Sequence, residues 1–160
     1  MKKNTRGFSL IELLIVVAII LIIAAIAIPN LLRSRIAANQ ASAVGSLRTL
    51  NTAQVTYAST YNVGYSLTLS YLAPPAATAN PTSQAAGLVD EVLAGGTKSG
   101  YQFTYTPGPS DASGRIDTYT MTATPISTST GTNSYYTDQS GVIRQNSTTT
   151  AGSTDSPIGG

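Results

Sequence analysis

Residues 8–28 form an almost unbroken apolar run, FSLIELLIVVAIILIIAAIAI, which constrains the fold more than any other feature of the chain. As an α-helix rising about 1.5 Å per residue, this run reaches roughly 31 Å, close to the ~30 Å hydrocarbon core of a membrane. The basic residues Lys2, Lys3 and Arg6 precede it. This cluster of positive charge before the apolar run favours a cytoplasmic N-terminus and an outward C-terminal body. We therefore predict a helix that enters the membrane once.

A cleaved secretory signal is the first alternative interpretation of this segment. Ala25 and Ala27 provide a small-x-small cleavage pattern at the end of the apolar run. Two features count against this alternative, because the run is longer than an ordinary signal core and the carboxylate of Glu12 lies near its start.

Glu12 needs a counter-ion if it enters the membrane, because an intramembrane charge costs about 3 kcal/mol at the centre of a spanning helix. No Lys, Arg or His lies between Phe8 and Pro29. Cleavage after Gly7 would create a new amine at Phe8, four residues before Glu12 and on the same helical face. That amine could pair with Glu12 of the same subunit or, in a staggered stack, of a neighbour. The alternative is an interfacial Glu12 whose carboxylate reaches the lipid headgroups.

Residues 2–20, KKNTRGFSLIELLIVVAII, resemble the N-terminal signature of type IV pilins and of the pseudopilins of type II secretion. The resemblance covers roughly the first 30 to 50 residues. It implies that a membrane peptidase cleaves after Gly7 and that Phe8 is then N-methylated. It also implies that Glu12 acts in assembly and that Pro29 is the kink-forming proline of the family. Many filament-forming pilins have a helix-loosening glycine within the apolar half, whereas this chain has Leu21.

The resemblance also implies a set of partners. They are further copies of the chain in a helical homopolymer, inner-membrane lipid before assembly, the prepilin peptidase, and the assembly platform with its ATPase. The expected locations are the bacterial inner membrane before assembly and a surface filament or periplasmic pseudopilus afterwards.

Pro29 either ends the helix or bends it, since proline inside a helix costs about 3 kcal/mol. The following residues favour continuation, because apolar side chains recur at three-, four- or seven-residue spacing, at Leu32, Ile36, Ala43, Leu47, Leu50, Tyr57 and Tyr61. This stripe predicts an amphipathic half, residues 29–61, that covers a sheet and ends near Asn62 and Gly64. The whole helix would be about 54 residues long, or roughly 80 Å. A coiled coil is the alternative for this half, but its heptads are impure.

The remaining residues, 62–160, predict a globular head with an antiparallel meander, which makes the chain an α+β protein of pilin-like fold. Residues 65–72 suit a strand or a helical turn, residues 74–81 a connector, and residues 86–94 a short helix. Period-two patterns predict strands at residues 101–106, 115–124, 134–137 and 142–145, with turns at 111–114 and 138–141. The Ser- and Thr-rich tail, residues 146–160, predicts a loose or surface-lying segment without buried side chains.

Composition excludes several kinds of function. The chain has no His and no Cys, which excludes histidine catalysis, thiolate sites and disulfides. Dispersed basic residues form no nucleic-acid site, and no constellation of side chains supports an enzyme. Asp111 and Asp117 flank one turn, but we predict a solvated loop there rather than a calcium site, and no cofactor.

Three functions remain, and the N-terminal signature is common to all of them. The first is a major pilin, the repeating subunit of a filament whose core is made of residues 8–28. The second is a secretion pseudopilin, and the third is a minor pilin acting in adhesion or DNA uptake. The small, hydroxyl-rich head favours the first, as does the nearly neutral balance of the chain after the leader, six basic against seven acidic residues.

Overall fold

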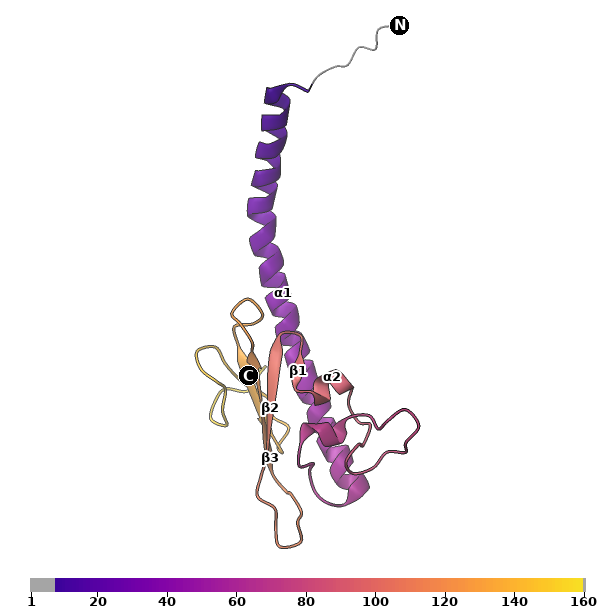
Figure 1. Ribbon diagram of the computed structural model, residues 1–160. Helices are drawn as coiled ribbons and strands as arrows, with labels where there is room; N and C mark the ends of the chain where they lie inside the picture. The colour runs from indigo at the N-terminus through magenta and orange to yellow at the C-terminus, as the bar shows by residue number, and fades with distance from the viewer. Residues whose placement is uncertain (1–7, 160) are drawn as a thin grey trace. The chain divides into compact units, whose positions relative to one another are not determined.

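The computed structural model describes residues 8–159, and Figure 1 shows its elements along the chain. The chain divides into two compact units, Met1–Arg35 and Ile36–Gly160. Helix α1 (Leu10–Tyr61) begins in the first unit and ends in the second.

Helix α1 continues through Pro29, so the alternative that the helix ends there is wrong. Its 52 residues agree with the predicted length. The helix ends where the sequence predicts, because Asn62 and Gly64 both have positive φ angles, 56° and 79°. A side chain could not replace the hydrogen of Gly64, since its Cβ would lie 2.2 Å from the carbonyl oxygen of Ile116.

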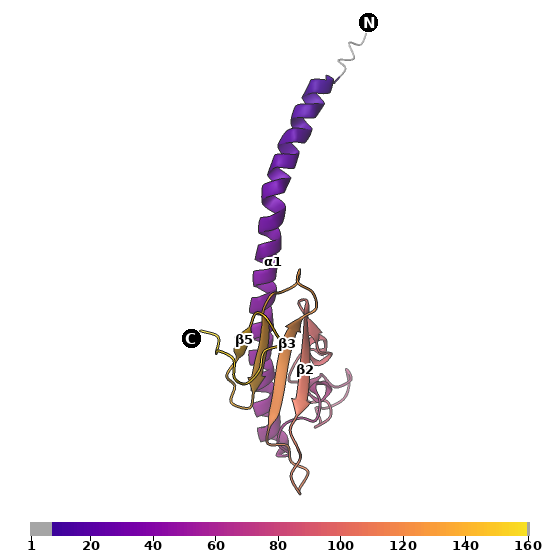
Figure 2. The same cartoon turned by 90° about the vertical axis from the view of Figure 1, so that its left-hand side faces the viewer.

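The second unit contains the predicted antiparallel meander, with five strands in the order β1-β2-β3-β4-β5. Figure 2 shows the sheet in front of the C-terminal part of α1, from residue 36 onward. The strands are β1 (Thr97–Lys98), β2 (Tyr101–Pro107), β3 (Tyr119–Pro125), β4 (Ser134–Asp138) and β5 (Arg144–Asn146). The predicted strands did not include β1, which is too short to show alternation. The predicted start of β3 and both predicted ends of β5 lie earlier in the chain than the observed ones.

Alternating side chains of the sheet form the core with one face of α1. In β2 and β3 the predicted in-phase residues Tyr101, Phe103, Tyr119, Met121 and Ala123 are buried. The helix contributes Ala43, Leu47, Leu50 and Tyr57 from the predicted stripe, whereas Leu32 is 44% exposed. Each buried aliphatic or aromatic side chain contributes about 1.5–3 kcal/mol to this packing.

A buried polar contact joins α1 to the segment that follows it. Gln54 and Ser66 are fully buried. The Gln54 amide donates to the Ser66 hydroxyl at 2.8 Å and accepts from the Ser66 backbone N–H at 2.9 Å. The Tyr105 hydroxyl of β2 donates to the Ser66 carbonyl. Because all these groups are paired, the contact fixes the reversal of the chain after α1 at little desolvation cost.

The predicted helix over residues 86–94 is wrong for most of its length. Only α2 (Glu91–Ala94) is helical, and the Asp90 side chain caps it by accepting from the Leu93 N–H at 2.8 Å. Before it, the backbone N–H groups of Leu88 and Val89 both donate to the Leu72 carbonyl, and Gly87 has a φ of 67°. The region predicted as a strand or a helical turn contains a 3₁₀ helix, η1 (Leu69–Leu72).

The C-terminal tail lies against the head, the second of the two arrangements predicted for it, but the prediction that it buries no side chain is wrong. Ala151 is buried, and Ile158 packs against the core. The Asp155 carboxylate accepts from the Asn146 side chain at 2.9 Å and from the Gly152 N–H at 2.8 Å. The Ser134 hydroxyl donates to the Thr149 carbonyl and accepts from the Ala151 N–H. The tail is therefore hydrogen-bonded to Ser134 at the start of β4, whereas Tyr135 belongs to the core and Thr137 accepts from the Asn51 side chain of α1.

We expect Asp155→Ala to release this tail, because the Asn146 amide and the Gly152 N–H both lose their acceptor. Unpaired donors of this kind cost about 1–3 kcal/mol. Hydrogen exchange at Ala151 and Ile158 should accelerate at least about tenfold, the equivalent of 1.4 kcal/mol. In the control variant Asp117→Ala, which changes an exposed carboxylate outside the tail, exchange at these positions should stay as in the parent chain.

Burial of tyrosines predicts a loss of stability in alkali. Burial raises the pKa of Tyr101 and of Tyr105 from 10.0 to about 12, and it also raises the pKa of Tyr119. Between pH 10 and pH 12 these tyrosines lose protons in the unfolded chain but keep them in the folded chain. The free energy of unfolding, which has its full value below pH 10, therefore declines as the pH rises. Circular dichroism of the detergent-solubilised chain should show unfolding above pH 10. A free energy of unfolding constant from pH 9 to pH 12 would contradict this linkage.

Candidate functional site

The apolar segment of the first unit has no packing partner within the chain. Every residue from Phe8 to Arg35 is exposed except Ala24, which is half-buried. Phe8 is 75% exposed and Leu10 80%. Among the described residues, α1 is the one helix long and apolar enough to cross a membrane, and none of that stretch is buried. Such an apolar surface requires lipid or other protein to cover it.

Glu12 is the charged residue of this apolar segment, and its side chain also caps the N-terminus of α1. Helix α1 starts at Leu10, so Ser9 occupies the N-cap and Glu12 the third helical position. The Ser9 backbone N–H donates to Glu12 Oε2 at 2.9 Å. This is one half of a capping box, in which the side chain at the third position satisfies a donor that the helix leaves free. The carboxylate is consequently turned toward the N-terminal end of α1.

The sequence analysis missed this role of Ser9, although the spacing Ser-x-x-Glu before an apolar run is a signal for it. The bond occupies Oε2 and leaves Oε1 without a hydrogen-bond partner among residues 8–159. A carboxylate can accept several hydrogen bonds, so capping is compatible with a second contact to a cation.

Of the other predicted site residues, the structure describes Phe8 and Pro29. Gly7 lies outside the described residues. Phe8 precedes α1 and is close in sequence to Glu12. Pro29 lies inside α1, which continues past it although proline has no backbone N–H to donate. The chain after the apolar run begins with two exposed arginines, Arg33 and Arg35.

Asp111 and Asp117 have structural partners. Asp111 Oδ1 accepts from the Ser113 hydroxyl at 2.6 Å and from the Arg115 N–H at 2.9 Å, which closes the predicted turn. These hydrogen bonds, led by that from the Ser113 hydroxyl, lower the pKa of Asp111. Asp117 pairs with the Arg115 guanidinium at 2.6 Å. Within residues 8–159 no three His, Cys, Asp or Glu side chains gather as metal ligands would.

Comparison with known proteins points to the N-terminal segment. The family model of the prokaryotic N-terminal methylation motif matches residues 2–28. The chain is 54% identical over 54 residues to the type IV major pilin protein PilA of Myxococcus xanthus, a stretch that covers 34% of this chain and 24% of that protein. It is 65% identical over 37 residues to the type IV wide pilus major component PilA4 of Thermus thermophilus, covering 23% of this chain and 28% of that protein.

The chain thus spans about a quarter of the length of the curated relatives it matches. No solved structure matches it. The motif and the relatives confirm the family resemblance that residues 2–20 predict.

Proposed function

Starting from its similarity to type IV pilins, we propose that this chain is the major structural subunit of a type IV pilus-like filament. Its segment 8–28 is inserted in the inner membrane and later packs into the filament core. Residues 1–7 are a leader that is removed, residues 29–61 are the amphipathic half of the helix, and residues 62–160 are the surface-facing head.

The observation that carries this proposal is the uncovered apolar surface from Phe8 onward. Each Leu, Ile or Val transferred from water to an apolar environment contributes about 1.5–3 kcal/mol. Lipid provides that environment before assembly, and the equivalent segments of other subunits provide it afterwards. A segment apolar on all sides suits both environments. The two relatives named as major pilus components support the filament as the final state.

The leader, residues 1–7, directs the cleavage and methylation of the chain. The basic residues Lys2, Lys3 and Arg6 hold the N-terminus in the cytoplasm, where the prepilin peptidase cuts after Gly7. Gly7 admits the backbone to a protease site without a side chain. The new N-terminal residue, Phe8, is then methylated, and the assembly platform with its ATPase extracts the subunit from lipid.

Glu12 pairs with the N-terminal amine of Phe8 in a neighbouring subunit. The support for this step is geometric, because the capping bond from Ser9 turns the carboxylate toward the end of the helix where that amine forms. Opposite charges attract strongly where water is excluded, and a buried pair that loses one member costs about 3–5 kcal/mol. A subunit placed one helical turn out of register would leave both charges unpaired.

Cleavage is tested with Gly7→Asp, which places a charged side chain where the peptidase must hold bare backbone. We expect the leader to remain, so that the intact mass of the membrane-extracted chain includes residues 1–7. The matched variant Asn4→Asp adds the same charge within the leader and should still be processed. A mature mass from Gly7→Asp would contradict the assignment of the cleavage site.

Pairing is tested by comparing Glu12→Val with Glu12→Gln. Valine removes both the charge and the cap, whereas glutamine keeps a carbonyl that can still accept the Ser9 N–H. Both variants should insert in the membrane. They should give at least about tenfold fewer filaments, because the Phe8 amine of a neighbouring subunit then lacks its counter-ion and remains as an unpaired buried charge. Normal filament yield from Glu12→Gln would show that capping, and not ion pairing, is what Glu12 contributes.

The function as a whole is tested by electron microscopy of sheared surface material, combined with mass spectrometry of the N-terminus. We expect filaments composed chiefly of this chain and beginning at a methylated Phe8. Surface material without this chain, or a chain beginning at Met1 or Ile28, would rule the proposal out.

A further inference from the structure

The charged side chains of the second unit are almost all used within the chain. Residues 36–159 contain four basic and six acidic side chains. Lys98 pairs with Asp90 at 2.8 Å, and Arg115 pairs with Asp117 at 2.6 Å. The remaining internal contacts belong to the tail and to two turns, where Arg144, Asp155, Asp111 and Asp138 all make hydrogen bonds.

Two opposite charges are left over. Within the part of the chain from residue 36 to residue 159, the Arg48 guanidinium and the Glu91 carboxylate form no ion pair or side-chain hydrogen bond. Both residues are exposed. Glu91 begins helix α2, and the next residue, Val92, is 60% exposed. An acid and an apolar side chain therefore protrude side by side.

Arg48 stands at one end of a face of α1 that carries no charge. From Thr49 to Tyr61 the helix has no acidic or basic residue, and Val55 on this stretch is 59% exposed. The Thr52 hydroxyl donates to the Arg48 carbonyl at 3.0 Å, and the Thr56 hydroxyl donates to the Thr52 carbonyl at 2.9 Å. Since these hydroxyls are satisfied by their own helix, the face offers methyl groups rather than free donors.

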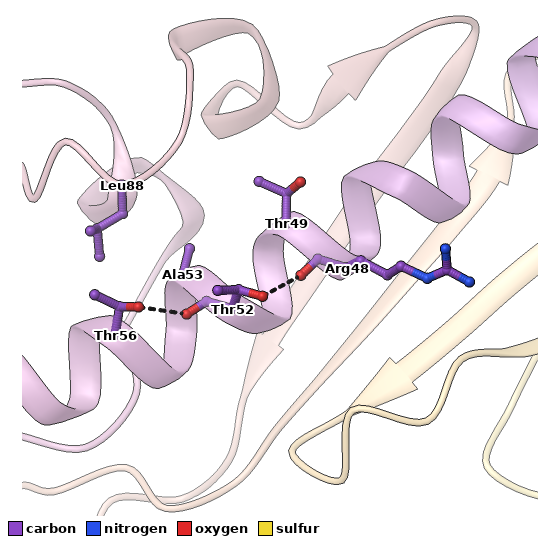
Figure 3. A pocket seen from close by; sticks show the side chains of 6 residues that line it. All are labelled: Arg48, Thr49, Thr52, Ala53, Thr56 and Leu88. Atoms are coloured by element: carbon purple, nitrogen blue, oxygen red, sulfur yellow. Dashed lines mark hydrogen bonds between the residues drawn. The ribbon is translucent and has the colours of Figure 1, made fainter.

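This face is hollowed beside the arginine. Figure 3 shows Thr49, Thr52, Ala53 and Thr56 in a row on α1, with Leu88 near one end and the Arg48 guanidinium extending beyond the other. These residues line a shallow hollow of about 340 Å³. Arg48 also borders two further hollows, of about 400 Å³ and 250 Å³, on the side of the C-terminal tail.

We propose that a threonine face made of the exposed residues Thr49, Thr52, Val55, Thr56 and Ser59 binds a second copy of the chain, with Arg48 paired to Glu91 of that copy. The inference rests on the proposed filament and names one contact between the second units of two subunits. Charge complementarity identifies the occupant, because residues 36–159 of each copy carry one unused cation, Arg48, and one unused acid, Glu91. Val92 beside Glu91 supplies an apolar side chain for the methyl-lined face. Such pairs contribute specificity and register more than affinity.

Complementary charge reversals in the full-length chain test this contact. Alone, Arg48→Glu sets two acids against each other between subunits, and Glu91→Arg sets two cations against each other. Each should reduce the yield of sheared filaments by about tenfold or more, since like charges at an interface are strongly unfavourable. Cells that make both variants together should recover filaments containing both chains, detected by their different masses. Mixing restores a contact between chains but cannot restore one within a chain.

Arg115→Glu and Asp117→Arg are the matched control, because this exposed pair already forms within one chain. They should assemble like the parent chain, and mixing them should change nothing. The double variant carrying both Arg48→Glu and Glu91→Arg should also assemble, which shows that the head tolerates the exchange. Normal filament yield from the single variants would overturn the proposal, and so would single variants that fail and are not rescued by mixing. If the parent chain itself makes no filaments, the proposed function fails instead.

Discussion

A helix that is apolar on every side governs the rest of this structure. From Leu10 to Leu32 all its side chains except the half-buried Ala24 lie exposed in the isolated chain, and water is the one environment in which such a surface is strongly unfavourable. Lipid or other copies of the segment must cover it. The head has the opposite character, because it is small, rich in hydroxyl groups and carries three basic and six acidic residues. It can therefore repeat along a surface in contact with water.

The single carboxylate within this helix has a consequence for its geometry. Glu12 satisfies the Ser9 N–H, one of the donors that every helix leaves free at its start. A helix end without such a partner would itself be costly in an apolar environment. Glu12 thus lowers the cost of starting a helix there, and its second oxygen remains available for a cation. One residue combines a local structural contribution with the proposed pairing between subunits.

The sequence predicted the features that rest on periodicity. The alternation of Tyr101, Phe103, Tyr119 and Met121 located β2 and β3, and the positive-φ residues Asn62 and Gly64 located the end of α1. It failed where backbone pairing between distant segments overrides local preference. Residues 86–89 were predicted to be helical, but their backbone N–H groups donate to the carbonyls of residues 71–73. The tail looked too polar to pack, yet Asp155, Asn146 and Ser134 satisfy its backbone donors. Neither contact leaves a signal in local composition.

Affinity and register arise from different parts of a chain like this one. The apolar side chains of residues 13–28 are so similar that two copies could slide past one another with little change in buried area. Burial is non-directional, so this surface can hold subunits together without fixing their relative position. Register must come from directional contacts, whose energy changes sharply with small displacements. The proposed pairing of Glu12 is one such contact in the helix. The second unit, having used its other charges internally, offers Arg48 and Glu91, and an ion pair there would fix the rise between subunits that the apolar segment leaves undetermined.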